Sequence, residues 1–137
     1  PPGLPMTAGL VGEDSNARIV YRELPVLSDV SRTAARWGLA AADQGKFKPF
    51  HTALYSAGQL SEASIRAAAA CAGLDTAKAQ AALATPRVEA EIASNLDVAG
   101  KLGVTGTPSW VIGDRVISGM VPYEVLQEAV KTARKKG

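Results

Sequence analysis

The feature that most constrains the fold of this chain is a proline directly before a short apolar run, at Thr107-Pro108. Proline cannot donate a hydrogen bond to a sheet ladder, so it belongs at the beginning of a strand. Two β-rich runs follow, Ser109–Ile112 and Arg115–Ile117, and only Gly113-Asp114 separates them. Two turn-forming residues between such runs predict an antiparallel hairpin. The chain is therefore expected to pass through a proline corner into a β-hairpin.

The loop before this hairpin is the candidate functional site. Gly103 and Gly106 allow the backbone to turn tightly and to approach another chain closely. A cis Thr107–Pro108 bond would cost only about 0.5–1 kcal/mol relative to trans. Such a corner exposes the backbone around Thr107 for pairing with an extended peptide. Gly106, Thr107 and Pro108 are thus the candidate binding residues, and a plain helix-to-strand turn is the alternative that these residues alone leave open.

The pattern between about residues 28 and 102 is helical throughout. Val30, Ala34, Trp37 and Ala41 recur at helical spacing and therefore share one face. Ser61 and Asp75 are suitable N-caps for later helices. The stretch predicts about five helices without a strand. A final helix begins near Pro122, which suits a first helical turn.

The segment Arg18–Glu23 alternates and is rich in β-formers, so a strand is predicted there. Leu4–Glu13 is interpreted as the remainder of a helix. The order of elements is then strand, helical block, hairpin and helix. No repeat or low-complexity linker divides the 137 residues, so one α/β domain with a helical insertion is expected.

Composition excludes several functions. A net charge of +2 is too small to suggest a nucleic-acid partner. No apolar run approaches the roughly 20 residues of a membrane span, and no signal peptide is present. His51 is the only histidine, and no second ligand supports a metal site. Cys71 is the only cysteine, so no internal disulfide forms, and it is expected to be a small buried hydrophobe. Trp37 and Trp110 are expected core anchors, although Trp110 could also flank a peptide groove.

Two stretches carry a resemblance to a known family. LGVTGTPSWVIGDRVISG with VPYEVLQEAV, and RIVYRELPVLSDVSRTAARWGLAAADQGKFKPFHTALY, resemble the DsbA-like thioredoxin-fold oxidoreductases over about residues 4–134. The resemblance implies a single domain over residues 1–137. Its thioredoxin-like core would comprise about residues 4–27 and 103–137 and be incomplete at the N-terminus, with a helical insertion at about 28–102. Pro108 matches the family's cis-proline, and Thr107 the residue before it.

The chain departs from the family at the redox motif. Family members carry Cys-x-x-Cys at the start of the first helix, where the helix N-terminus lowers the pKa of the exposed cysteine. The family's spacing would place the second cysteine just before Pro1. Without a dithiol this chain is expected to exchange no disulfides, to have no catalytic residue and to need no cofactor. Its unpaired sheet edges are expected to favour a homodimer or a domain-swapped dimer.

Three functions follow from the resemblance. The first is a member or fragment of a thiol-disulfide oxidoreductase that acts on cysteines of exported proteins in the periplasm or cell envelope. The second is a non-catalytic module that binds proteins or peptides through the cis-proline loop. The third is a relative of the glutathione-dependent isomerases and transferases, which share the core and a similar proline loop.

Overall fold

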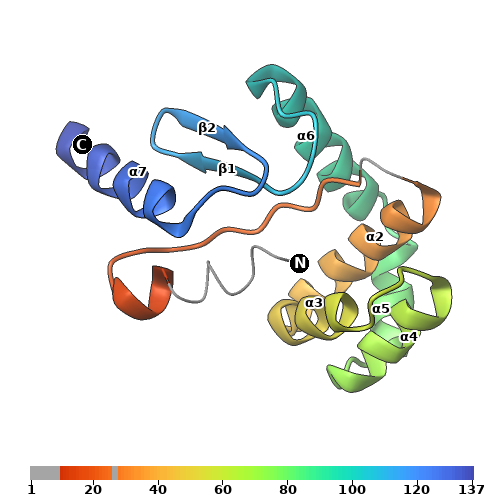
Figure 1. Cartoon of the computed structure of the whole chain (residues 1–137). Helices are drawn as coiled ribbons and strands as arrows, with labels where there is room; N and C mark the ends of the chain where they lie inside the picture. The colour runs from red at the N-terminus through yellow and green to blue at the C-terminus, as the bar shows by residue number, and fades with distance from the viewer. Residues whose placement is uncertain (1–9, 26–27) are drawn as a thin grey trace. The chain divides into compact units, whose positions relative to one another are not determined.

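A computed structural model of the chain describes residues 10–25 and 28–137. Residues 10–13 are helical. The described elements that follow are α2 (Asp29–Asp43), α3 (Phe47–Ser56), α4 (Glu62–Cys71), α5 (Thr76–Leu83), α6 (Pro86–Leu102), β1 (Ser109–Ile112), β2 (Arg115–Ser118) and α7 (Tyr123–Lys136) (Figure 1). The described chain is thus mostly helical with one two-stranded antiparallel sheet. It divides into two compact units, residues 22–98 and the remainder on either side.

Side-chain caps begin three of the helices in the first of these units. A serine or aspartate oxygen accepts the backbone N–H three residues later, which satisfies one of the free amides of the first turn. The pairs are Ser28 with Ser31 at 3.2 Å, Ser61 with Ser64 at 3.1 Å, and Asp75 with Lys78 at 3.0 Å. At α4 the Ser64 hydroxyl also accepts the Ser61 N–H at 2.8 Å, which completes a capping box. The predicted caps Ser61 and Asp75 are therefore confirmed.

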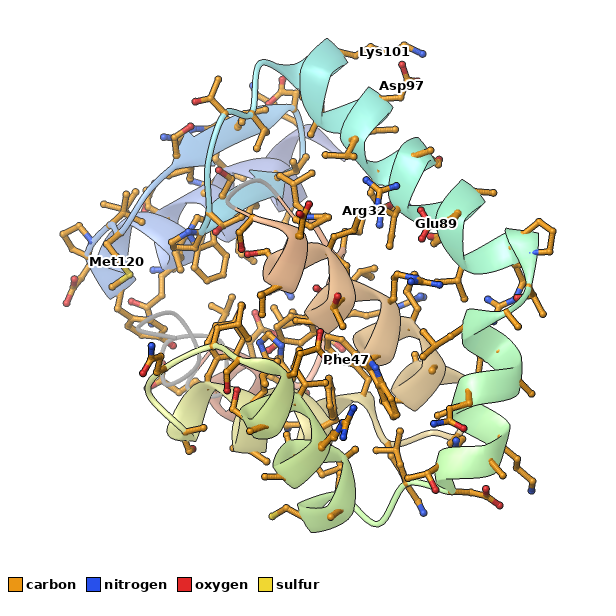
Figure 2. The ribbon with its side chains drawn as sticks, turned by 90° about the vertical axis from the view of Figure 1, so that its right-hand side faces the viewer. Arg32, Phe47, Glu89, Asp97, Lys101 and Met120 are labelled. Atoms are coloured by element: carbon orange, nitrogen blue, oxygen red, sulfur yellow. The ribbon has the colours of Figure 1, made fainter. Side chains whose placement is uncertain are left out.

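The unit of residues 22–98 has a closed apolar core among α2, α3, α4 and α5. Phe50 and Ile65 are fully buried in it, and Trp37 packs against it while partly buried. A second cluster joins Ala35 of α2 to Val88 and Ile92 of α6. On the surface of this contact Arg32 lies 2.5 Å from Glu89, and Figure 2 shows the two side chains facing each other between α2 and α6. Small alanine side chains let these helices approach closely.

The second unit consists mainly of the hairpin and α7. β1 and β2 pair in the register Ser109 with Ser118 and Ile112 with Arg115. Gly113 begins the two-residue turn at φ +61°, which glycine adopts without strain. A Cβ at this glycine would lie 2.8 Å from the Cβ of Ala133 in α7, so the turn needs glycine for space as well. Figure 1 shows the hairpin and α7 side by side.

The hairpin and the helical block are confirmed, but three local predictions are wrong. Arg18–Glu23 is not a strand, because it belongs to no sheet of the described residues. Its last two residues form hydrogen bonds with the Asn95 side chain of α6 instead. Cys71 is exposed, because the buried face of α4 is formed by Ile65, Ala68 and Ala69. Pro122 is the N-cap of α7 and not part of its first turn. Of the predicted helix Leu4–Glu13, residues 4–9 lie outside the described residues.

Candidate functional site

The proline loop connects the end of α6 to β1. Gly103 ends the helix at φ +72°, and the Val104 N–H donates to the Ala99 carbonyl at 2.8 Å. A glycine in the left-handed region followed by such a bond is a common way to end a helix. The chain then crosses Thr105 and Gly106 and reaches the strand. The end of α6 thus fixes where the loop begins.

Hydrogen bonds hold the loop on both sides of Thr107. The Ser109 hydroxyl donates to the Gly106 carbonyl at 2.7 Å, and the Gly119 N–H donates to the Pro108 carbonyl at 2.8 Å. The Thr107–Pro108 peptide bond is cis. The structure therefore brings the three predicted residues together in one short loop that the hairpin supports.

Thr107 itself is exposed, and no other described residue bonds its N–H or its C=O. A Cβ added at Gly106 would meet no atom of the described residues within 4 Å, so they leave the space in front of the loop open on that side. An extended peptide pairs with backbone N–H and C=O groups of this kind, which a fixed loop leaves unbonded at an exposed residue. The loop thus presents one donor and one acceptor to a partner.

Two apolar residues, Met120 and Trp110, are close to residues of this loop. Met120 directly follows Gly119, whose N–H donates to the Pro108 carbonyl. The Met120 side chain is 52% exposed, and Figure 2 shows it at the molecular surface. Methionine adapts its shape to varied apolar partners. Trp110 is half-buried against Ile117 and Leu126, as expected of a core anchor, and its buried indole N–H has no partner in the described chain.

The other predicted residues lie in the unit of residues 22–98. His51 stacks on Phe47 with ring centroids 5.1 Å apart, and it meets the edge of Tyr55 at 4.6 Å. Burial lowers the pKa of His51 to about 4, so its imidazole is neutral at neutral pH. No group of three potential metal ligands occurs among the described residues.

Cys71 lies at the end of α4, where it lines a hollow of about 780 Å³ between α3 and α4 together with Thr52 and Ser64. The proline loop belongs to the other compact unit, and the sequence contains no second cysteine. The chain as given therefore holds no dithiol beside the loop.

Sequence reasoning missed two residues whose environments are unusual. The Asn95 side chain is buried on α6, accepts a bond from Arg22 and donates one to the Glu23 carbonyl. Burial raises the pKa of the Glu23 carboxyl to about 7. One signal was available in the sequence: Gly38 interrupts α2, where glycine costs roughly 0.5–1 kcal/mol relative to alanine and so requires a packing reason.

Comparison with known proteins identifies the family. The family model described as "DSBA-like thioredoxin domain" matches residues 12–131, nearly the whole chain. The chain belongs to the DsbA-like thioredoxin family. Its fold is accordingly thioredoxin-like, as the solved structures of similar proteins also show. The resemblance drawn from the proline loop and the hairpin is confirmed.

Three solved structures are closely similar. A thioredoxin-like oxidoreductase from Silicibacter pomeroyi has a TM-score of 0.91 and 42% identity, with 98% of this chain and 78% of that chain covered. ScsC from Proteus mirabilis has a TM-score of 0.83 and 26% identity, with 96% of this chain and 74% of that chain covered. A periplasmic thioredoxin-like protein from Salmonella enterica serovar Typhimurium has a TM-score of 0.80 and 28% identity, with 94% of this chain and 73% of that chain covered.

Two curated relatives are much longer proteins. "Na(+)/H(+) antiporter NhaA 1" of Salinispora arenicola is 34% identical and "Na(+)/H(+) antiporter NhaA 3" of Salinispora tropica is 32% identical, each over 133 residues. The match covers 94% of this chain but 20% of each relative, so the chain spans about a fifth of their length. Within the described residues no helix is long and apolar enough to cross a membrane.

Proposed function

We propose that this chain is the peptide-recognition part of a DsbA-like thiol-disulfide oxidoreductase that acts on exported proteins. In this proposal, Gly106, Thr107 and Pro108 bind an extended segment of the substrate. The observation that carries the proposal is the exposed backbone of Thr107, which no described residue bonds, within a loop that hydrogen bonds hold on both sides. A loop held in place before binding loses little conformational entropy when a peptide pairs with it.

The proposal separates recognition from chemistry. Disulfide exchange proceeds by attack of a thiolate on a disulfide sulfur, and release of the mixed disulfide requires a second thiol. The one cysteine of the chain, Cys71, lies at the end of α4 where no dithiol can form. The chain alone is therefore expected to bind peptides without exchanging their disulfides.

Calorimetric titration with reduced and alkylated insulin B chain tests binding in the absence of thiol chemistry. The full chain should bind this extended polypeptide, and Pro108→Ala should abolish the binding heat, because the loop would no longer present Thr107 in the same orientation. Pro122→Ala, at the exposed N-cap of α7, is the matched control and should bind as the original chain does. Equal binding by the original chain and Pro108→Ala would overturn the assignment of the loop.

Insulin reduction is the matching test of chemistry. The full chain should catalyse no reduction above background, and Cys71→Ser should behave identically. Turnover that Cys71→Ser removes would show that this thiol is catalytic and would contradict the proposal. A melting temperature raised by glutathione would instead favour the glutathione-dependent alternative, for which the described residues offer no separate observation.

The proposed compartment is the periplasm or cell envelope. Support comes from the relative of Salmonella enterica serovar Typhimurium, which is described as periplasmic and is 28% identical over 94% of this chain. An oxidising compartment is also where disulfide exchange with exported proteins takes place. Fractionation of cells that express the native gene is the direct test.

We also propose that copies of the chain associate through the hairpin. In the described chain β1 and β2 pair only with each other, so each strand has an outer edge without a strand partner, and Val111 and Val116 are exposed on them. Such edges favour pairing with another chain. Light scattering should report a dimer, whereas a monodisperse monomer would contradict this part of the proposal.

A further inference from the structure

Glu23 lies in a segment that α6 holds by two side-chain bonds. The Asn95 amide donates to the Glu23 carbonyl at 3.1 Å, and the Arg22 guanidinium donates to the Asn95 carbonyl oxygen at 3.0 Å. Asn95 is 4% exposed, so its end of both bonds is buried, whereas Arg22 is exposed. These bonds place the Glu23 backbone beside α6, so its side chain can reach only a limited volume.

The Glu23 carboxyl occupies space that a glycine leaves open on α2. A Cβ at Gly38 would lie 2.6 Å from the Glu23 Oε1 and 3.5 Å from the Phe47 ring. Gly38 is buried within the helix, where any residue except proline would be more favourable for helix formation. The carboxyl thus lies in a site formed by one helix backbone and one aromatic ring. We call this the Gly38 site.

No charged group of the described chain neutralises the carboxyl in the Gly38 site. On α2, Arg32 and Arg36 bond Glu89, and Asp43 pairs with Arg87 of α6. On Glu23's own segment the Arg22 guanidinium is engaged by Asn95, which is the α6 group that meets this segment.

Two titratable side chains of α3 also belong to the surroundings, whereas Lys48 of α3 lines the hollow beside α4. His51 is neutral at neutral pH because burial lowers its pKa to about 4. Burial and then the negative charge of Glu23 raise the pKa of Tyr55, which places Tyr55 within electrostatic range of the carboxyl. Neither of these groups supplies a positive charge to Glu23 at neutral pH.

We propose that Glu23 and the Gly38 site form a pH-sensitive latch: the protonated carboxyl holds residues 22–25 against α2 and α3, and loss of its proton releases them. The step is a one-proton exchange with solvent and needs no other reactant. A neutral carboxyl packs against the helix and the ring at little cost, whereas a carboxylate there lacks a donor and must draw in water or leave. The latch is independent of peptide binding at the proline loop.

The pH window follows from the two ionisation states. The unfolded carboxyl ionises near its ordinary pKa of 4.5, and burial raises the folded pKa to about 7. The folded state therefore binds more protons between these values, so the latch stabilises fully below about pH 4.5 and loses that contribution as pH rises through 7. His51 acts in the opposite direction, because its folded pKa is lowered and its contribution grows from about pH 4 to 6.5.

Glu23→Gln isolates the latch, because the amide imitates the protonated carboxyl and both proteins retain His51. Urea unfolding should give equal stabilities at pH 4.5. At pH 7.5 the variant's folding equilibrium constant should exceed the original's by roughly tenfold to a hundredfold. A hundredfold effect corresponds to a difference of about two units between the folded and unfolded pKa of Glu23. Glu91→Gln, at an exposed glutamate of α6, should follow the original protein at both pH values. A difference between Glu23→Gln and the original protein that does not change with pH would overturn the proposal.

Two further measurements keep the test decisive if Glu23→Gln folds poorly. In the original protein, the amides of Arg22 and Leu24 should lose protection from hydrogen exchange between pH 6 and 8, after correction for intrinsic rates. The Glu23 side-chain carboxyl, followed by NMR in the original protein, should ionise near pH 7 and not near its ordinary 4.5. Constant protection of both amides across the range would rule out the latch.

Discussion

Among the described residues, the unit of residues 22–98 buries a large apolar core, whereas the unit that carries the proline loop buries few side chains. In the first, Phe50 and Ile65 are fully inaccessible and α2, α3, α4 and α5 surround them. In the second, the buried cluster consists of Ile117, Leu126 and Ala129, with Trp110 half-buried beside it. Apolar burial is the main stabilising term in folding. The comparison indicates that the helical unit supplies most of the stability, and the hairpin unit carries the loop that we propose for recognition.

Large apolar side chains are also exposed in the hairpin unit. Val111 and Met120 are more than half exposed in the hairpin unit, near the loop that leaves Thr107 open. Binding sites are commonly drawn from the less stable parts of a protein because they must remain accessible. The difference between the units is therefore consistent with recognition at the proline loop.

The largest expected effect is that of Phe50→Ala in the helical unit. Removal of a fully buried phenylalanine leaves a cavity and should cost about 3–5 kcal/mol of unfolding free energy. Urea denaturation followed by circular dichroism measures this. Leu60→Ala, at a side chain 39% exposed, is the control and should cost less than about 1 kcal/mol. A loss at Phe50 no larger than at Leu60 would refute the closed core.

Leu126→Ala is the corresponding change in the hairpin unit. It should cost about 2–4 kcal/mol, because Leu126 is fully buried in a small cluster. Hydrogen exchange should show lost protection in β1, β2 and α7 while α4 keeps its protection. Equal loss in α4 would mean that the chain unfolds as one unit, and the contrast between the two parts would then be wrong.

A pair of glycine substitutions tests the hairpin turn at finer scale. Gly113→Ala should destabilise by about 1–2 kcal/mol, because φ is +61° and the added Cβ would lie 2.8 Å from the Cβ of Ala133. Gly100→Ala should instead stabilise by about 0.5–1 kcal/mol, since this glycine lies in α6 and no described atom is within 4 Å of its Cβ position. Thermal unfolding measures both, and effects of the same sign would contradict the described turn.

Local patterns predicted much of this fold because their causes are local. Ser61 caps α4 through its own neighbours, and Gly113-Asp114 forms a turn through the left-handed backbone conformation of Gly113. The family followed from the proline loop and the hairpin, whose residues are contiguous in the sequence. These features need no knowledge of distant contacts.

The errors arose where distant contacts decide the structure. Arg18–Glu23 has the composition of a strand, but a strand requires a neighbour, and Asn95, far along the chain, takes the Glu23 carbonyl. Cys71 has the composition of a core residue but lies off the buried face of α4. The Gly38 site was invisible because it joins a loop carboxyl to a helix glycine.

Hydrogen exchange at the Thr107 amide tests the central claim most directly. In the free chain this amide should exchange rapidly, because it is exposed and no described residue accepts its proton. Addition of reduced and alkylated insulin B chain should protect Thr107 strongly and leave Ala67, in the hollow beside Cys71, unchanged. Binding that protects Ala67 but not Thr107 would contradict recognition at the proline loop.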